Sequence, residues 1–135
     1  MSSHEMNLED VVATVYDTLR FVKDPEKDAT LEELDVLQED KIKVSKLDRG
    51  KYLVHVRFVP TVPHCSLATL IGLCIRVKLA QSLPFPYKII IEVQQGTHDT
   101  ADEVNKQIND KERVAAALEN PNLSAIVKKC ISDDG

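Results

Sequence analysis

The sequence is poor in the features that mark nucleic-acid-binding proteins. It has no tryptophan, and aromatic residues make up 4% of its 135 residues, so stacking platforms for unpaired bases are not expected. The formal net charge is −5, and the basic residues between positions 41 and 49 are interspersed with acidic ones. Without a dense basic patch, we expect no direct contact with nucleic acid.

The sequence also lacks the signals of membrane insertion and secretion. Its longest largely apolar run, residues 67–75, is far shorter than the roughly 20 residues that a membrane-spanning helix needs. The first ten residues, MSSHEMNLED, contain neither a basic n-region nor an apolar h-region, so we expect no secretory signal. Its three cysteines, Cys65, Cys74 and Cys130, form no CxxC pair, which is typical of a protein in the reducing cytoplasm.

The length and apolar content predict one compact domain. A chain of 135 residues with 43% hydrophobic residues can bury a core without help from disulfides or a structural metal. We therefore expect a single domain over residues 1–135, with frayed ends at 1–7 and 132–135.

Hydrophobic periodicity predicts seven elements in the order α-β-β-α-β-α-α. Thr30 and Glu33, at capping-box spacing, predict a helical turn before the first strand, and Arg76 and Lys78 are expected on the solvent side of the second helix. The predicted helices cover residues 9–21, 66–81, 104–118 and 121–131, with a break near Asn109, and the predicted strands cover residues 42–46, 52–59 and 88–95.

These elements predict an α+β fold with a small mixed β-sheet covered by helices. The tight LDRG turn at residues 47–50 joins the first two strands as an antiparallel hairpin. The second strand, the long helix and the third strand form a parallel crossover, so the loops after these two strands leave the same edge of the sheet. That edge is the expected site, and its loops carry Thr61, His64, Cys65, Ser66, Thr97, His98 and Thr100.

Cys65 is the candidate functional thiol of this edge. It lies at the expected start of a helix, where unpaired N–H groups and the helix dipole favour a thiolate. Simpler roles also fit: Cys65 as a buried structural thiol, and His64 and His98 as loop histidines bonded to the backbone. We expect Cys74 to lie in the core and Cys130 to be inert. No phosphate loop, HExxH or GxSxG motif is present.

Several stretches in matching order resemble the cytosolic iron–sulfur assembly component 2 family, the eukaryotic branch of a domain that also occurs in PaaD-like and SufT-like bacterial proteins. LIGLCIRVKL and NPNL are most similar to its 2A branch. These stretches are DPE at residues 24–26, TLEEL at 30–34, PTVPHCSLATLIGLC at 60–74, GTH at 96–98 and NKQINDKERVAAALENPNL at 105–123.

The resemblance implies a targeting adaptor, not an enzyme, that delivers iron–sulfur clusters to client apoproteins. It implies a WD40-propeller partner, a HEAT-repeat subunit, XPD-type helicase clients, the cytoplasmic tail of Crumbs and a link to chromosome segregation. Its reactive cysteine corresponds to Cys65, its DPE acids to Asp24 and Glu26, and its TH pair to Thr97 and His98. The protein is then cytoplasmic, with nuclear and spindle-associated pools, and forms domain-swapped dimers through hinges such as LPFPY at residues 83–87.

Two chemical roles for Cys65 follow. As an adaptor thiol it contacts a transient iron–sulfur cluster or metal ion, with His64 and His98 as further ligands and no tightly bound cofactor. The alternative is a small thiol-dependent enzyme with Cys65 as nucleophile and one of the two histidines as base.

Overall fold

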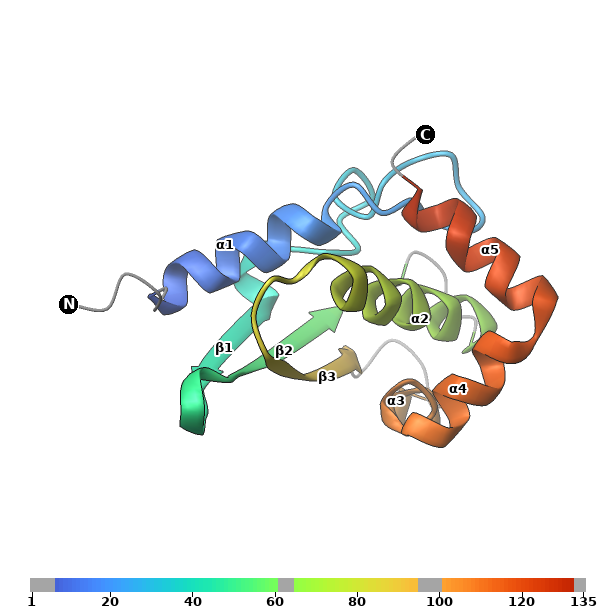
Figure 1. Cartoon of the computed structure of the whole chain (residues 1–135). Coiled ribbons are helices and arrows are strands. Elements are labelled where there is room, and N and C mark those ends of the chain that lie inside the picture. The colour runs from blue at the N-terminus through green and yellow to red at the C-terminus, as the bar shows by residue number, and fades with distance from the viewer. Residues whose placement is uncertain (1–6, 61–64, 95–100, 133–135) are drawn as a thin grey trace.

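The computed structural model describes residues 7–60, 65–94 and 101–132, and confirms the predicted α+β fold. Three strands, β1 (Ile42–Lys46), β2 (Tyr52–Phe58) and β3 (Tyr87–Val93), form one sheet in the order β1-β2-β3. The β1–β2 pair is antiparallel and the β2–β3 pair is parallel, as predicted. Figure 1 shows α1 (Leu8–Leu19) and α2 (Cys65–Ser82) together on one side of this sheet.

The remaining helices extend from the end of β3. α3 (Ala101–Asn109) packs against β3 and α2, α4 (Lys111–Glu119) follows it, and α5 (Pro121–Ile131) returns to α2. The predicted helical stretch over residues 104–118 is divided into α3 and α4, which confirms the break predicted near Asn109. Asp110 causes the division because its extended backbone stops α3, while its side chain accepts hydrogen bonds from the first N–H groups of α4.

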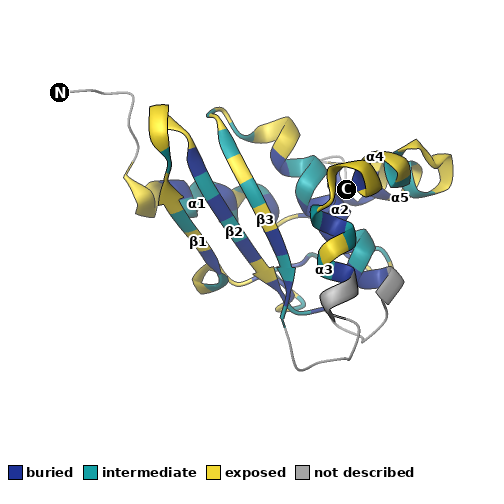
Figure 2. Cartoon of the chain, turned by 90° about the horizontal axis from the view of Figure 1, so that it is seen from below, coloured by how far each residue is buried: buried dark blue, intermediate teal, exposed yellow. Residues whose placement is uncertain are grey.

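Strand alternation places the core between the sheet and the helices. Tyr52, Val54, Val56 and Phe58 are buried on the face toward the helices, while the residues between them are exposed or half-buried. This confirms the period of two in the sequence. Figure 2 views the sheet from the side opposite α1 and α2. The alternation of buried residues with half-buried and exposed ones along β2 is visible there.

Local sequence signals explain the turns. Thr30 and Glu33 form a reciprocal capping box, in which the Glu33 N–H donates to Thr30 Oγ1 (3.1 Å) and the Thr30 N–H donates to Glu33 Oε1 (3.0 Å). A hydrogen-bonded turn follows it in place of a longer helix. The hairpin turns through a short 3₁₀ segment, η2 (Asp48–Gly50), in which Arg49 and Gly50 have φ values of 65° and 73°.

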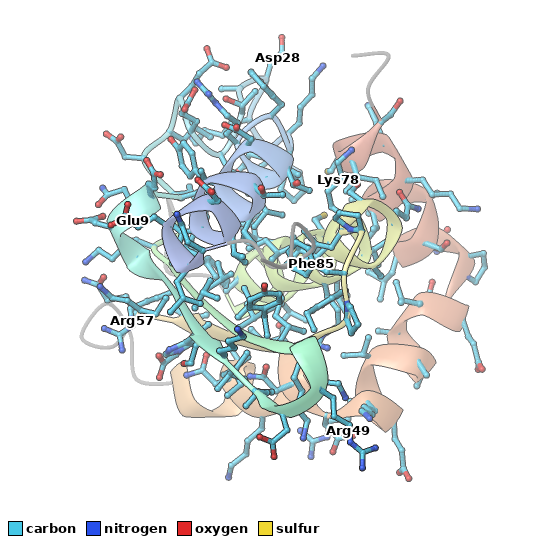
Figure 3. The ribbon with its side chains drawn as sticks, turned by 60° about the vertical axis from the view of Figure 1, so that its left-hand side comes forward. Glu9, Asp28, Arg49, Arg57, Lys78 and Phe85 are labelled. Carbon is cyan, nitrogen blue, oxygen red and sulfur yellow. The ribbon has the colours of Figure 1, made fainter. Side chains whose placement is uncertain are left out.

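The prediction that Arg76 and Lys78 face solvent is wrong. Both are half-buried, because α3 and α5 pack on the flanks of α2. Arg76 donates to the carbonyl of Ile108 (2.9 Å), and Lys78 donates to the carbonyl of Ile131 at the end of α5 (3.4 Å; Figure 3). α2 is thus the central helix of the molecule. None of the described helices is both long and apolar enough to cross a membrane.

Candidate functional site

The carboxyl ends of β2 and β3 lie side by side, as the predicted site requires. Phe58 is the register partner of Val93, and the Gln94 N–H donates to the Phe58 carbonyl (2.9 Å). α2 begins at Cys65, which confirms that this cysteine occupies the first turn of the helix. Its backbone N–H is therefore among those that lack a partner within the helix and favour negative charge.

The two loops at this edge carry most of the predicted site. Thr61, His64, Thr97, His98 and Thr100 lie outside the described residues, as do the side chains of Cys65 and Ser66, so their mutual arrangement stays a prediction. Within the described part of the chain, no group of three or more histidine, cysteine or acidic side chains could hold a metal ion.

Two asparagines on α3 hold the far end of the second loop. The Val93 N–H donates to Asn105 Oδ1 (2.7 Å), which ties the end of β3 to the first half of α3 across residues 94–104. One turn later, Asn109 bonds both backbone groups of Ile91. The sequence analysis did not predict that either asparagine would bond to the third strand, although their spacing of four residues placed them on one helix face. These side chains fasten the end of β3 to α3, the two described elements on either side of residues 95–100.

The DPE acids lie on a separate loop, residues 23–30, which we call the Asp24 loop. Asp24 Oδ1 accepts hydrogen bonds from the N–H groups of Glu26 (2.8 Å) and Lys27 (3.0 Å), and these bonds close a tight turn around Pro25. Asp24 is 4% exposed, and within the described residues its buried Oδ2 has no hydrogen-bond partner. Glu26 is exposed, and Asp28 points away from the body of the molecule (Figure 3).

A pocket of about 600 Å³ lies between residues 23–28 of the Asp24 loop and the end of α5, and Cys130 lines it. The Lys23 N–H donates to the Cys130 carbonyl (2.9 Å), which joins the loop to the end of α5. Lys129 and Ile126 line the α5 side of the same pocket. The acidic loop and the C-terminal helix thus form one surface.

Cys130 also contacts Cys74 in the middle of α2. The interaction between the two thiols is the main reason that the pKa of Cys130 is lowered and the pKa of Cys74 is raised. The charge of Asp24 acts in the opposite sense on Cys130, since it raises the pKa of both thiols. Cys74 is buried, as predicted.

The structure brings Asp24 to Cys74 and Cys130. Cys74 lies nine positions after Cys65 in α2, about 14 Å along the helix axis. The contact between Cys74 and Cys130 escaped the sequence analysis because the two residues lie on different helices and no local pattern links them. The expectation that Cys130 is inert concerns its chemical reactivity and stays a prediction. Because Cys130 lines a pocket, its accessibility is relevant to that reactivity.

Comparison with known proteins identifies the family of this chain. A profile of the family described as "Iron-sulfur cluster assembly protein" matches residues 12–93, which include Asp24, Glu26 and Cys65. The chain is 53% identical over 135 residues to MIP18 family protein galla-1 of Drosophila melanogaster, covering 97% of this chain and 62% of that protein. It therefore spans less than two thirds of the length of galla-1.

Two further relatives extend the likeness to a plant and a mammal. Protein AE7 of Arabidopsis thaliana is 56% identical over 120 residues, which cover 89% of this chain and 74% of AE7. The mouse protein named cytosolic iron-sulfur assembly component 2B is 50% identical over 118 residues, covering 87% of this chain and 71% of that protein. With more than half of its residues matched by the profile, this chain belongs to the MIP18 family of iron–sulfur cluster assembly proteins.

Proposed function

We propose that this protein is a component of the cytosolic iron–sulfur assembly machinery and acts as a non-enzymatic adaptor that helps deliver clusters to client apoproteins. The observation that carries this proposal is the match of residues 12–93 to the iron–sulfur assembly family. The 50% identity to a mouse protein whose name states the cytosolic assembly role supports it.

In this proposal, Cys65 is the residue that contacts the iron–sulfur cluster. At the first position of α2, the unpaired N–H groups and the helix dipole lower the free energy of a thiolate, which is a soft ligand for iron. One thiolate cannot hold a whole cluster, so the remaining ligands come from a partner or a second copy of the chain. Within this chain, His64 and His98 are the candidates for additional ligands beside Cys65. The cluster is cargo in this scheme, and no tightly bound cofactor is required.

The partners follow from the family resemblance. We assign to the protein a WD40-propeller subunit, a HEAT-repeat subunit, XPD-type helicase clients and the cytoplasmic tail of Crumbs. A link to chromosome segregation and cytoplasmic, nuclear and spindle-associated pools belong to the same proposal.

LIGLCIRVKL and NPNL favour the 2A branch, while one of the matched relatives is a component 2B. Domain-swapped dimers would exchange elements through residues 83–86 between α2 and β3.

The decisive experiment replaces the thiol in cells that carry no other copy of the protein. Cys65→Ser should lower the radioactive iron incorporated into client apoproteins while the WD40 subunit still copurifies. Ser82→Ala, at the exposed opposite end of the same helix, is the matched control and should load clients like wild type. Unchanged client loading with Cys65→Ser would remove the cluster role of this residue.

Alkylation kinetics separate the adaptor from the thiol-dependent enzyme. A nucleophile paired with a histidine base shows a depressed pKa and fast alkylation near neutral pH. A Cys65 pKa near the free-thiol value of about 8.5, with slow alkylation, would eliminate the enzyme. Fast alkylation with normal client loading in the Cys65→Ser cells would favour it instead.

A further inference from the structure

Cys74 and Cys130 form a pair of thiols that the proposed delivery function does not use. We propose that they are an oxidisable dithiol, a modification site that closes into a disulfide between α2 and α5 when a hydroperoxide reaches Cys130 through the pocket beside the Asp24 loop. This site is independent of Cys65.

The first support is the geometry of the pair. Cys74 is 1% exposed and Cys130 is 4% exposed, and both belong to the hydrophobic core. They come from α2 and α5, two helices that pack against each other, and each thiol is the main influence on the pKa of the other. Two neighbouring cysteines on packed helices can reach disulfide geometry by side-chain rotation and a small shift of the helices. Folding therefore brings the two cysteines together before oxidation, so the disulfide should form faster in the folded chain than in the unfolded one.

The second support is access from one side. Cys130 lines the pocket of about 600 Å³ between the Asp24 loop and α5, whereas Cys74 lies behind it in α2. The pocket also contains the basic residues Lys23, Lys27 and Lys129, whose charge offsets the acids of the loop. A small uncharged oxidant can thus meet Cys130 first.

The third support is the difference between the two thiols. The interaction with Cys74 is the main cause of the lowered pKa of Cys130, and it outweighs burial and the charge of Asp24, which act in the opposite sense. The same interaction and burial raise the pKa of Cys74. The thiolate is the nucleophile in thiol oxidation, so Cys130 reacts first and Cys74 remains protonated as the resolving thiol.

The chemical steps balance with a hydroperoxide as the only co-reactant. The Cys130 thiolate attacks the terminal peroxide oxygen, the O–O bond breaks, and a sulfenic acid forms while the leaving oxygen takes a proton. The Cys74 sulfur then attacks the sulfenic sulfur. An S–S bond forms, the S–O bond breaks, and the departing hydroxide takes the Cys74 proton as water. Two thiols lose two electrons, and the peroxide is reduced by two.

Oxidation of the two thiols would restrain the Asp24 loop. The Cys130 carbonyl accepts the Lys23 N–H, and the unpartnered carboxylate oxygen of Asp24 lies near the two sulfurs. A disulfide fixes the end of α5 to the middle of α2 and so fixes the backbone to which the loop is bonded. The family's acidic motif would therefore be held in one position in the oxidised chain.

The test uses the full chain with Cys65→Ser, which leaves only the two thiols of interest. Brief hydrogen peroxide treatment should remove both titratable thiols together and lower the intact mass by two hydrogens. Trypsin should then release residues 58–76 joined to residues 130–135, since cleavage follows Arg57, Arg76 and Lys129. The same treatment in urea should form this link at least tenfold more slowly, because unfolding separates the cysteines.

Two further measurements decide the outcome without relying on one variant. Phenylarsine oxide, which binds only paired thiols tightly, should add once to the folded Cys65→Ser chain, and not to the same chain carrying Cys74→Ala as well. In that second variant, checked for folding by circular dichroism, peroxide should stop at a sulfenic acid on Cys130 that dimedone traps. The proposal is overturned if the folded chain binds no arsenical, or if Cys130 oxidises while Cys74 stays titratable.

Discussion

The Asn109 side chain joins the last strand to α3 through several hydrogen bonds at once. Its Oδ1 accepts the Ile91 N–H (2.9 Å), and its Nδ2 donates to the carbonyls of Ile91 and Asn105 (both 2.7 Å). Arg76 of α2 adds a bond to the same Oδ1 (3.2 Å). The two bonds to Ile91 pair both of its backbone groups, which would otherwise be unpaired on the free edge of β3.

Asn109→Ala removes these bonds and leaves the β3 edge unpaired. A net value of about 0.5–1.5 kcal/mol for each of the three short bonds predicts a loss of about 1.5–4.5 kcal/mol of unfolding free energy. Asn105→Ala removes the bond from the Val93 N–H (2.7 Å) and should cost about 1 kcal/mol. Because both residues lie on α3, the difference between the two variants reflects the number of bonds lost and not helix propensity.

Urea unfolding followed by circular dichroism measures the effect. For a chain of this size, the Asn109→Ala midpoint should fall by roughly 1–2 M. Asn122→Ala, at an exposed position of α5, is the control and should change the free energy by less than about 0.5 kcal/mol. If Asn109→Ala costs no more than this control, the amide does not hold the edge of β3. Asn109→Asp keeps the volume but loses the donors, so it should also destabilise the chain.

Two other sites give independent predictions. An added Cβ at Gly72 would lie 2.7 Å from Ile108 Cγ2, so Gly72→Ala should destabilise the chain, since overpacking of about 1–3 kcal/mol outweighs the roughly 1 kcal/mol that alanine gains in a helix. Hydrogen bonds from Tyr16 (2.6 Å) and Arg20 (3.1 Å) lower the pKa of Glu32 below its ordinary value of 4.5. Wild type should therefore be more stable than Glu32→Gln above this pH, and the advantage should vanish as the pH falls through the lowered pKa.

Each of these predictions has its own check. Adding Ile108→Ala to Gly72→Ala should cost less than the sum of the two single changes, and strict additivity would mean that the two residues do not compete for space. For Glu32, urea midpoints of both chains at pH 7 and at about pH 3 give the difference directly. A difference that stays constant between the two pH values would show that the carboxylate charge contributes nothing.

The elements with strong local signals were predicted closely. β1 has the predicted bounds because a turn and an alternating pattern fix both of its ends. α2 differs by one residue at each end, and α5 begins with Pro121 at the position where its missing N–H costs nothing. The parallel β2–β3 pair followed from the length of the crossover between them. Here local hydrogen bonding and chain geometry decide the result.

The errors and omissions share one cause, which is packing between distant segments. Arg76 was expected in solvent because α2 was treated alone, whereas α3 covers that flank. The Cys74–Cys130 contact and the pocket beside the Asp24 loop depend on where α5 returns to the body of the protein. No periodicity in one element reports the position of another.

The sequence by itself determined the order of the elements, the buried face of each strand, the place of Cys65 at the start of α2, and the resemblance that the comparisons confirmed at the level of the family. These features depend on residues close together in the chain or on motifs read directly. Only the tertiary structure decided that Cys74 and Cys130 lie near each other beside the Asp24 loop, and that asparagines bond the edge of β3. Those contacts join residues far apart in sequence, and they form because burial of the shared core brings the helices together.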